Sequence, residues 1–126
     1  MELTDLDKLA LAQYTVHEKQ CIYQAIYAAM LSDDAWRSAM LEKIRNLNEM
    51  VYMFGLKQEE LDESRSLDTQ ELTRDIRDMN YLKRLHVGVL MKRMVMADAV
   101  VTQREKMFIQ HFYEKFNIPA EDVERL

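Results

Sequence analysis

The chain has 126 residues, of which only two are Gly and one is Pro, and its formal net charge is −5. Sandwiches and barrels need turn residues about every 8–12 positions, so this composition excludes them. Gly55 and Gly88 are also too far apart in the chain to form a glycine-rich phosphate-binding loop. An all-α fold remains, and we predict a compact bundle of about six to eight helices in one domain, residues 1–126.

The charge balance narrows the functional classes. Proteins that bind the phosphate backbone usually have excess positive charge, whereas here 22 acidic residues outnumber 17 basic ones. We therefore expect no nucleic-acid binding and interpret the basic pairs Lys83-Arg84 and Lys92-Arg93 as a solvated helix face.

The expected location is the cytoplasm. The sequence shows no signal-like N-terminal segment and no apolar run long enough to insert into a membrane. Cys21 is the one cysteine and has no partner for an internal disulfide, which fits a reducing compartment.

Two helices are predicted at the N-terminal end of the chain. The segment from Met1 to Tyr14 is predicted to form a short opening helix, with Thr4 as its N-cap. Thr15 and Glu18 form a capping-box pattern, in which the hydroxyl accepts a hydrogen bond from the third helical N–H and the glutamate reaches back. The helix that they open extends to about residue 31 and carries one apolar face. That face consists of Ile22, Ala25, Ile26 and Ala29.

The third predicted helix has a regular apolar pattern that ends at Gly55. Its apolar residues recur every three or four positions, the spacing of one helix face. They are Trp36, Met40, Ile44, Leu47, Val51 and Phe54. Glycine accepts the left-handed conformation that commonly follows a last helical turn, so Gly55 stops the helix. The polar and acidic residues 57–67 are predicted to form a loop or a single turn.

Four more helices are predicted after residue 67. Asp68 caps the first of them. The second, from Tyr81 to Ala97, is apolar nearly all round, which is typical of a helix at the centre of a bundle. Thr102 and Glu105 form another capping box for the third helix. Its core face consists of Phe108, Ile109, Phe112 and Phe116. Pro119 is expected at the first position of a short terminal helix.

Two stretches of the chain share one layout. Each has a helix that closes on Phe, then a residue tolerant of the left-handed conformation, an apolar residue and two acids. The first contains Phe54-Gly55-Leu56 and Glu59-Glu60, and the second contains Phe116-Asn117-Ile118 and Glu121-Asp122. We predict two similar helical hairpins with Gly55 and Asn117 at equivalent positions. Because many helices end this way, chance similarity is the alternative.

A sequence motif lies at the junction that precedes the helix of the second stretch. It consists of Asp98, Val101, Thr102 and Glu105. This spacing resembles the TerB-like family, which includes tellurite-resistance proteins and the N-terminal domain of a DnaJ-like co-chaperone. The family motif reads Ala-Asp-Gly, then a β-branched residue, Ser or Thr, and Glu seven positions after the Asp. The resemblance implies an all-helical fold of two pseudo-equivalent halves.

The resemblance also implies a site, because acidic residues near the helix junctions of TerB-like proteins are associated with divalent cations. It implies Ca²⁺ or Mg²⁺ as the ligand and Asp98 as the first metal-binding candidate. The full candidate surface is Asp98, Glu105, Asp33 and Asp34. The chain departs from the motif twice: Ala99 replaces the family's Gly, and Ser32-Asp33-Asp34-Ala35 stands where Ala-Asp-Gly is expected in the first half.

Two interpretations of these acids stay open. Asp98 follows a helix C-terminus, where a negative charge costs about 0.3–1 kcal/mol against the macrodipole and a cation would offset that cost. The default interpretation is an Asx-type turn, because a hard cation needs roughly six to eight oxygen ligands. Glu105 likewise has a structural role as the capping-box partner of Thr102.

Other reactive side chains give weaker signals. His17 and Cys21 share a helix face, but two ligands do not make a zinc site, so we expect a structural pair. Without an orienting group or an oxyanion donor, the pair does not indicate a nucleophile. The other histidines, His86 and His111, bring no visible partners. Most of the ten methionines are expected in the core and some at an interface.

The sequence therefore predicts a non-catalytic TerB-like binding or scaffold module, related to stress response and sensitive to divalent cations. Its partner is expected to be another protein or a second copy of the chain. The alternative is a metal-independent helical adaptor or homo-oligomerisation domain, and the third hypothesis is a small enzyme.

Overall fold

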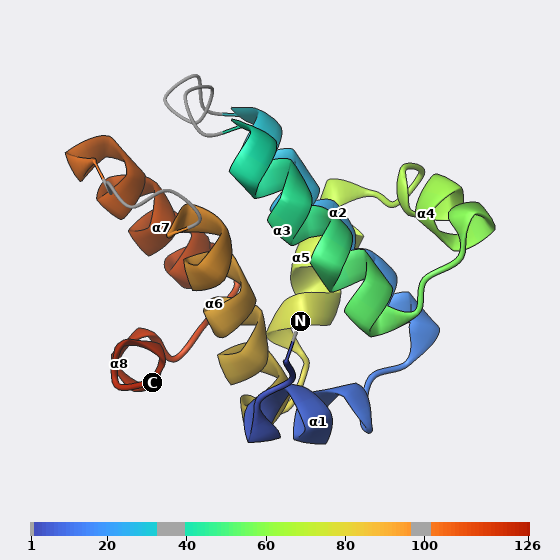
Figure 1. The fold of residues 1–126 in the computed structure, drawn as a ribbon, viewed down its shortest axis with the longest axis horizontal. Helices are drawn as coiled ribbons and strands as arrows, with labels where there is room; N and C mark the ends of the chain where they lie inside the picture. The colour runs from blue at the N-terminus through green and yellow to red at the C-terminus, as the bar shows by residue number, and fades with distance from the viewer. Residues whose placement is uncertain (1, 33–39, 97–101) are drawn as a thin grey trace.

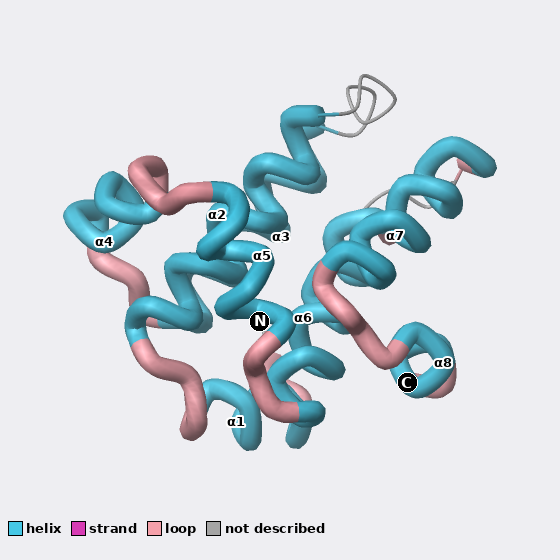
Figure 2. Tube along the Cα trace, turned by 180° about the vertical axis from the view of Figure 1, so that it is seen from behind, coloured by secondary structure: helices cyan, strands magenta, loops and turns pink. Residues whose placement is uncertain are grey.

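The computed structural model describes residues 2–32, 40–96 and 102–126. These residues form helices and loops without a strand, which confirms the predicted all-α bundle (Figure 2). The eight helices of the described ranges are α1 (Asp5–Leu11), α2 (Val16–Ser32), α3 (Met40–Phe54), α4 (Gln58–Ser64), α5 (Thr69–Arg77), α6 (Tyr81–Val95), α7 (Gln103–Lys115) and α8 (Ala120–Glu124). No helix among them is long and apolar enough to cross a membrane.

Two helices organise the bundle. Helix α2 packs against α3, α4 and α5, whereas α6 packs against α1, α3, α7 and α8 (Figure 1). The central position predicted for α6 is confirmed, since four helices pack against it and seven of its fifteen residues are buried. These seven are His86, Val87, Gly88, Leu90, Met91, Met94 and Val95.

The internal repeat appears as two units of three helices. The first unit is α2, α3 and α4, and the second is α6, α7 and α8. In each unit the third helix packs back on the first. The corner before it is left-handed in both, with φ of 68° at Gly55 and 53° at Asn117. The same hydrogen bond closes both corners, from Leu56 N–H to Val51 O and from Ile118 N–H to Tyr113 O.

Helix α4 corrects the prediction of a loop or single turn at 57–67. The Glu60 side chain accepts a hydrogen bond from the Lys57 N–H at 2.8 Å, which closes the first turn. The Gln20 side chain of α2 donates to the Glu60 carbonyl at 2.8 Å, and Ser64 is fully buried. Contacts with α2 therefore stabilise a helix that the polar composition of residues 57–67 did not indicate. At α8 the correction is smaller, because Pro119 is the N-cap rather than the first helical residue.

The buried face of α3 also differs from the predicted stripe. It consists of Lys43, Leu47, Met50 and Phe54. Ile44, predicted in the core, is 40% exposed, and Val51 is only half-buried. The helix is thus rotated so that a lysine occupies a core position. Trp36, the first residue of the predicted stripe, lies outside the described residues.

The predicted helix caps are confirmed at three sites. The hydroxyls of Thr4, Thr15 and Thr102 each accept a hydrogen bond of 3.1 Å from the third N–H along the helix. Asp68 stands at the N-cap of α5, but its side chain makes no capping bond.

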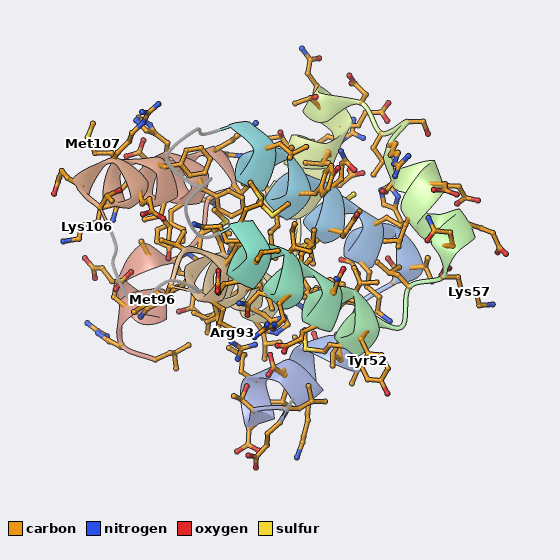
Figure 3. All side chains as sticks on the ribbon, turned by 45° about the horizontal axis from the view of Figure 1, so that its top comes forward. Tyr52, Lys57, Arg93, Met96, Lys106 and Met107 are labelled. Atoms are coloured by element: carbon orange, nitrogen blue, oxygen red, sulfur yellow. The ribbon has the colours of Figure 1, made fainter. Side chains whose placement is uncertain are left out.

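Of the nine methionines that the structure describes, five are buried and two more, Met40 and Met53, pack partly buried against the core, which agrees with the predicted methionine-rich core. The five buried ones are Met30, Met50, Met79, Met91 and Met94. Met96 and Met107 are each 56% exposed, and Met107 points outward from α7 in Figure 3. Tyr52, on the outer face of α3, is 86% exposed.

Gly88 lets α8 approach α6 closely, and replacing it tests this packing. A Cβ at Gly88 would lie 2.6 Å from a methyl carbon of Ile118 and of Val123. We expect Gly88→Ala to lower the free energy of unfolding by about 1–3 kcal/mol in urea denaturation, through overpacking.

Gly55→Ala is the matched control. Its Cβ meets nothing within 4 Å, so its cost of about 1–2 kcal/mol comes from the left-handed backbone alone. Adding Val123→Ala to Gly88→Ala removes one of the two clashing side chains, so the double variant should lose less free energy of unfolding than the two single losses added. Adding Val123→Ala to Gly55→Ala relieves no clash, so there the two losses should add in full. Equal additivity in both backgrounds would contradict the close approach.

Candidate binding site at the two helix junctions

The structure describes one of the four predicted acidic site residues. Glu105 lies in the first turn of α7. Asp33, Asp34 and Asp98 lie outside the described residues, in the segments 33–39 and 97–101. Helix α3 begins directly after the first segment, and α7 begins one residue after the second. The described part of this site therefore consists of the first turns of α3 and α7, which follow the two segments.

Glu105 is a buried carboxylate with partners on two helices. Its Oε1 lies 3.3 Å from the Thr102 N–H nitrogen and 3.2 Å from the Thr102 hydroxyl, which completes the predicted capping box. Its Oε2 lies 3.6 Å from Nζ of Lys43 on α3. The side chains of Glu105 and Lys43 are 4% and 1% exposed. Glu105 thus caps its own helix and binds α3.

The Lys43–Glu105 pair joins equivalent positions of the two repeat units. Lys43 stands twelve residues before Gly55, and Glu105 stands twelve residues before Asn117. Buried Tyr113 of α7 matches the half-buried Val51, but three other pairs of buried residues match in the same way. These pairs are Leu47 with Ile109, Met50 with Phe112, and Phe54 with Phe116. The first turns of α3 and α7 are therefore held together by opposite charges at one repeat position.

A second buried charge network joins α1 to α6. Asp7 Oδ1 accepts hydrogen bonds from His86 Nε2 at 2.7 Å and from Arg93 at 2.9 Å. The Tyr14 hydroxyl lies 2.8 Å from His86 Nδ1. His86 thus has two partners, contrary to the expectation from sequence. In Figure 3, Arg93 lies between α6 and α1.

The pKa shifts fix the protonation of this network. Burial lowers the pKa of His86 more than the nearby Asp7 raises it, so His86 is neutral and donates from Nε2 to Asp7. Burial raises the pKa of Tyr14 far above its usual value, so its hydroxyl donates to Nδ1. Burial also tends to raise the pKa of Asp7, but hydrogen bonds from Arg93, the Thr4 N–H and His86 outweigh it and hold that pKa well below its ordinary value. Asp7 is therefore ionised and His86 neutral.

Burial gives this network a structural role. Asp7 and His86 are 1% and 0% exposed, so a reacting molecule cannot reach either group without opening the α1–α6 contact. The network fixes the position of α1 on the central helix.

The basic residues of α6 are not the solvated face expected from the sequence. Lys83 lies 2.8 Å from Glu18, and Lys92 lies 3.6 Å from Glu124. Arg93 binds Asp7, as above, and Arg84 donates to the carbonyl of Asn117 at 2.6 Å. These cations connect α6 to its neighbours, so the cluster is part of the packing.

An apolar groove of about 700 Å³ lies along α1, α6 and α8. Its lining includes Leu6, Val89, Met96, Val123 and Leu126. Met96 and Leu126 are 56% and 67% exposed. This groove could not be predicted from the sequence, because its residues come from helices that lie far apart in the chain.

Comparison with known proteins identifies a family. The family model for tellurite resistance protein TerB matches residues 9–126, which include both repeat units. No curated protein and no solved structure matches the chain significantly.

The protonation of the Asp7–His86 network predicts that acid destabilises the fold. The pKa values of His86 and Asp7 are both lower in the folded chain than in the unfolded chain. The unfolded chain therefore binds more protons, and stability falls as the pH falls. The free energy of unfolding should decrease below about pH 6.5, where unfolded histidine takes up a proton, and further below about pH 4, where unfolded Asp does.

Two variants isolate this effect in urea denaturation at several pH values. His86→Gln should remove the decrease between pH 7 and 5, whereas His111→Gln, on the exposed face of α7, should keep it. An unchanged pH profile in His86→Gln would show that the histidine is not held neutral in the fold.

Proposed function

The chain belongs to the TerB family, and from this premise we propose that it is a non-catalytic binding or scaffold module whose acidic helix junctions bind a divalent cation. In this proposal the cation controls the binding of a protein partner in a cytoplasmic stress response. The single observation that carries it is the buried Lys43–Glu105 pair, which joins the helices that follow the two acidic segments.

The pair supports a shared site for a physical reason. Ca²⁺ and Mg²⁺ take about six or more oxygen ligands, including water, which a single short junction rarely supplies. Because α3 and α7 are joined at their first turns, the acids of both segments precede neighbouring helix starts. We propose Asp98, Asp33 and Asp34 as ligands. Glu105 is the fourth acid of the site and links the two junctions through Lys43.

A cation bound in this way would act on the surface of the bundle. It would offset the cost of the acidic charge that follows α6 and would link the two repeat units at their junctions. A partner that recognises the linked form would then bind with an affinity that depends on the cation. No substrate conversion is part of this proposal.

Thermal unfolding with added CaCl₂ or MgCl₂ tests the cation. A ligand that binds only the folded state raises the melting temperature, and by more as its concentration rises. We expect a rise of several degrees for the unmodified chain and little or none for Asp98→Asn. Asp78→Asn is the matched control, because Asp78 is an exposed acid at the C-terminal end of α5, and it should respond like the unmodified chain.

Two results would contradict the cation site. One is a melting temperature that does not change with either cation. The other is the same shift in Asp98→Asn as in the unmodified chain, which would place the cation elsewhere.

The apolar groove favours a second candidate, a metal-independent module that associates with a second copy of itself. Exposed apolar surface at Met96 and Leu126 is the observation behind it. Light scattering on the same samples separates the two. A mass above the monomer without cations favours self-association, and a monomer at all concentrations excludes it.

A further inference from the structure

Three metal-binding side chains meet between α2 and α5, away from the helix junctions. His17 and Cys21 lie one turn apart on α2, and Asp75 reaches them from α5. His17 Nε2 lies 2.8 Å from Asp75 Oδ2 and 3.5 Å from Cys21 Sγ. The three donor atoms all lie within 4.8 Å of one another. Asp75 therefore supplies the third ligand that a zinc site requires, in addition to the pair His17 and Cys21 seen in the sequence.

The spacing of these atoms suits a tetrahedral ion. With Zn–S of about 2.3 Å and Zn–N of about 2.0 Å, two ligands of a tetrahedral zinc ion stand about 3.5 Å apart. The Sγ–Nε2 distance of 3.5 Å already has this value. The Nε2–Oδ2 distance is that of a hydrogen bond and would lengthen by about 0.5 Å to admit the ion. The Sγ–Oδ2 distance lies within 4.8 Å, and the ion would hold these two atoms about 3.5 Å apart.

The same geometry argues against a nucleophilic triad. Such a triad uses one ring nitrogen for the nucleophile and the other for the orienting acid, whereas here Cys21 and Asp75 both face Nε2 of His17. Burial, with the nearby charges of Asp75 and Glu18, raises the pKa of the Cys21 thiol to about 12. The thiol is thus protonated at neutral pH and unsuited to nucleophilic attack.

The cluster is open to solvent on one side. The side chains of His17 and Asp75 are 52% and 27% exposed, and Cys21 lies beneath them at 0%. The capping box of Thr15 and Glu18 fixes the first turn of α2, which carries His17. Asp75 uses Oδ1 for its bond with Arg74 at 3.3 Å, so Oδ2 is the atom directed at His17. An ion can approach from this face and keep one position for water.

We propose that His17, Cys21 and Asp75 form a binding site for a divalent cation of the zinc class, with water in the fourth position. On binding, the thiol releases its proton to solvent, the imidazole carries its proton on Nδ1, and Asp75 Oδ2 changes from hydrogen-bond acceptor to ligand. Sulfur and nitrogen donors select zinc or cobalt over calcium or magnesium. This site is therefore independent of the proposed junction site in both residues and ion.

Cobalt titration of the reduced full chain tests the site. A Cys21 thiolate bound to Co²⁺ gives a near-ultraviolet charge-transfer band, and tetrahedral coordination gives visible bands. We expect both, with one ion per chain and displacement by Zn²⁺. Cys21→Ser should remove the charge-transfer band. His17→Gln and Asp75→Asn, which change exposed or partly exposed side chains, should weaken binding at least about tenfold.

Two control variants separate this site from others. His111→Gln changes a histidine on α7 and should bind cobalt like the unmodified chain. Asp98→Asn should also leave cobalt binding unchanged, even if it removes the response to calcium. Circular dichroism without metal checks that each variant folds. The absence of a charge-transfer band in the unmodified chain, or its persistence in Cys21→Ser, would overturn the proposal.

Discussion

A charge buried in a protein must be paired, and this constraint decides how the helices of the bundle meet. Glu105 and Lys43 bury opposite charges on α7 and α3, and Asp7 binds His86 and Arg93 on α6. Removing one partner of such a pair costs about 3–5 kcal/mol, because the other charge stays buried. The first contact joins the two repeat units, and the second holds α1 on the central helix.

Features set by a few neighbouring residues were predictable from the sequence, whereas features set by distant contacts were not. The capping boxes and the corners at Gly55 and Asn117 follow from local backbone chemistry. The periodicity of α3 correctly predicted Leu47 and Phe54 as buried but not Lys43, whose buried partner Glu105 lies far along the chain. Helix α4 could have been predicted from the repeat, because the residues after Asn117 form the equivalent helix α8.

The same division applies to the candidate sites. The TerB motif predicted the acids of the helix junctions, since a motif is a local pattern. No sequence motif includes Lys43. Only its position in the repeat, which is equivalent to that of Glu105, indicates that the two side chains pair. His17 and Cys21 were visible as a pair one turn apart. Asp75 is 58 residues from His17 in the chain, so only the packing of α5 on α2 brings it to them.

A double-mutant cycle on Lys43 and Glu105 tests most directly whether this buried pair joins the two repeat units. Glu105→Gln keeps an oxygen to cap α7 and removes the charge, and Lys43→Met keeps the length of the side chain. Urea denaturation should show a large loss of stability for each variant alone. The double variant should lose less than the two losses added, with a coupling of at least about 1 kcal/mol. Strictly additive losses would contradict the account.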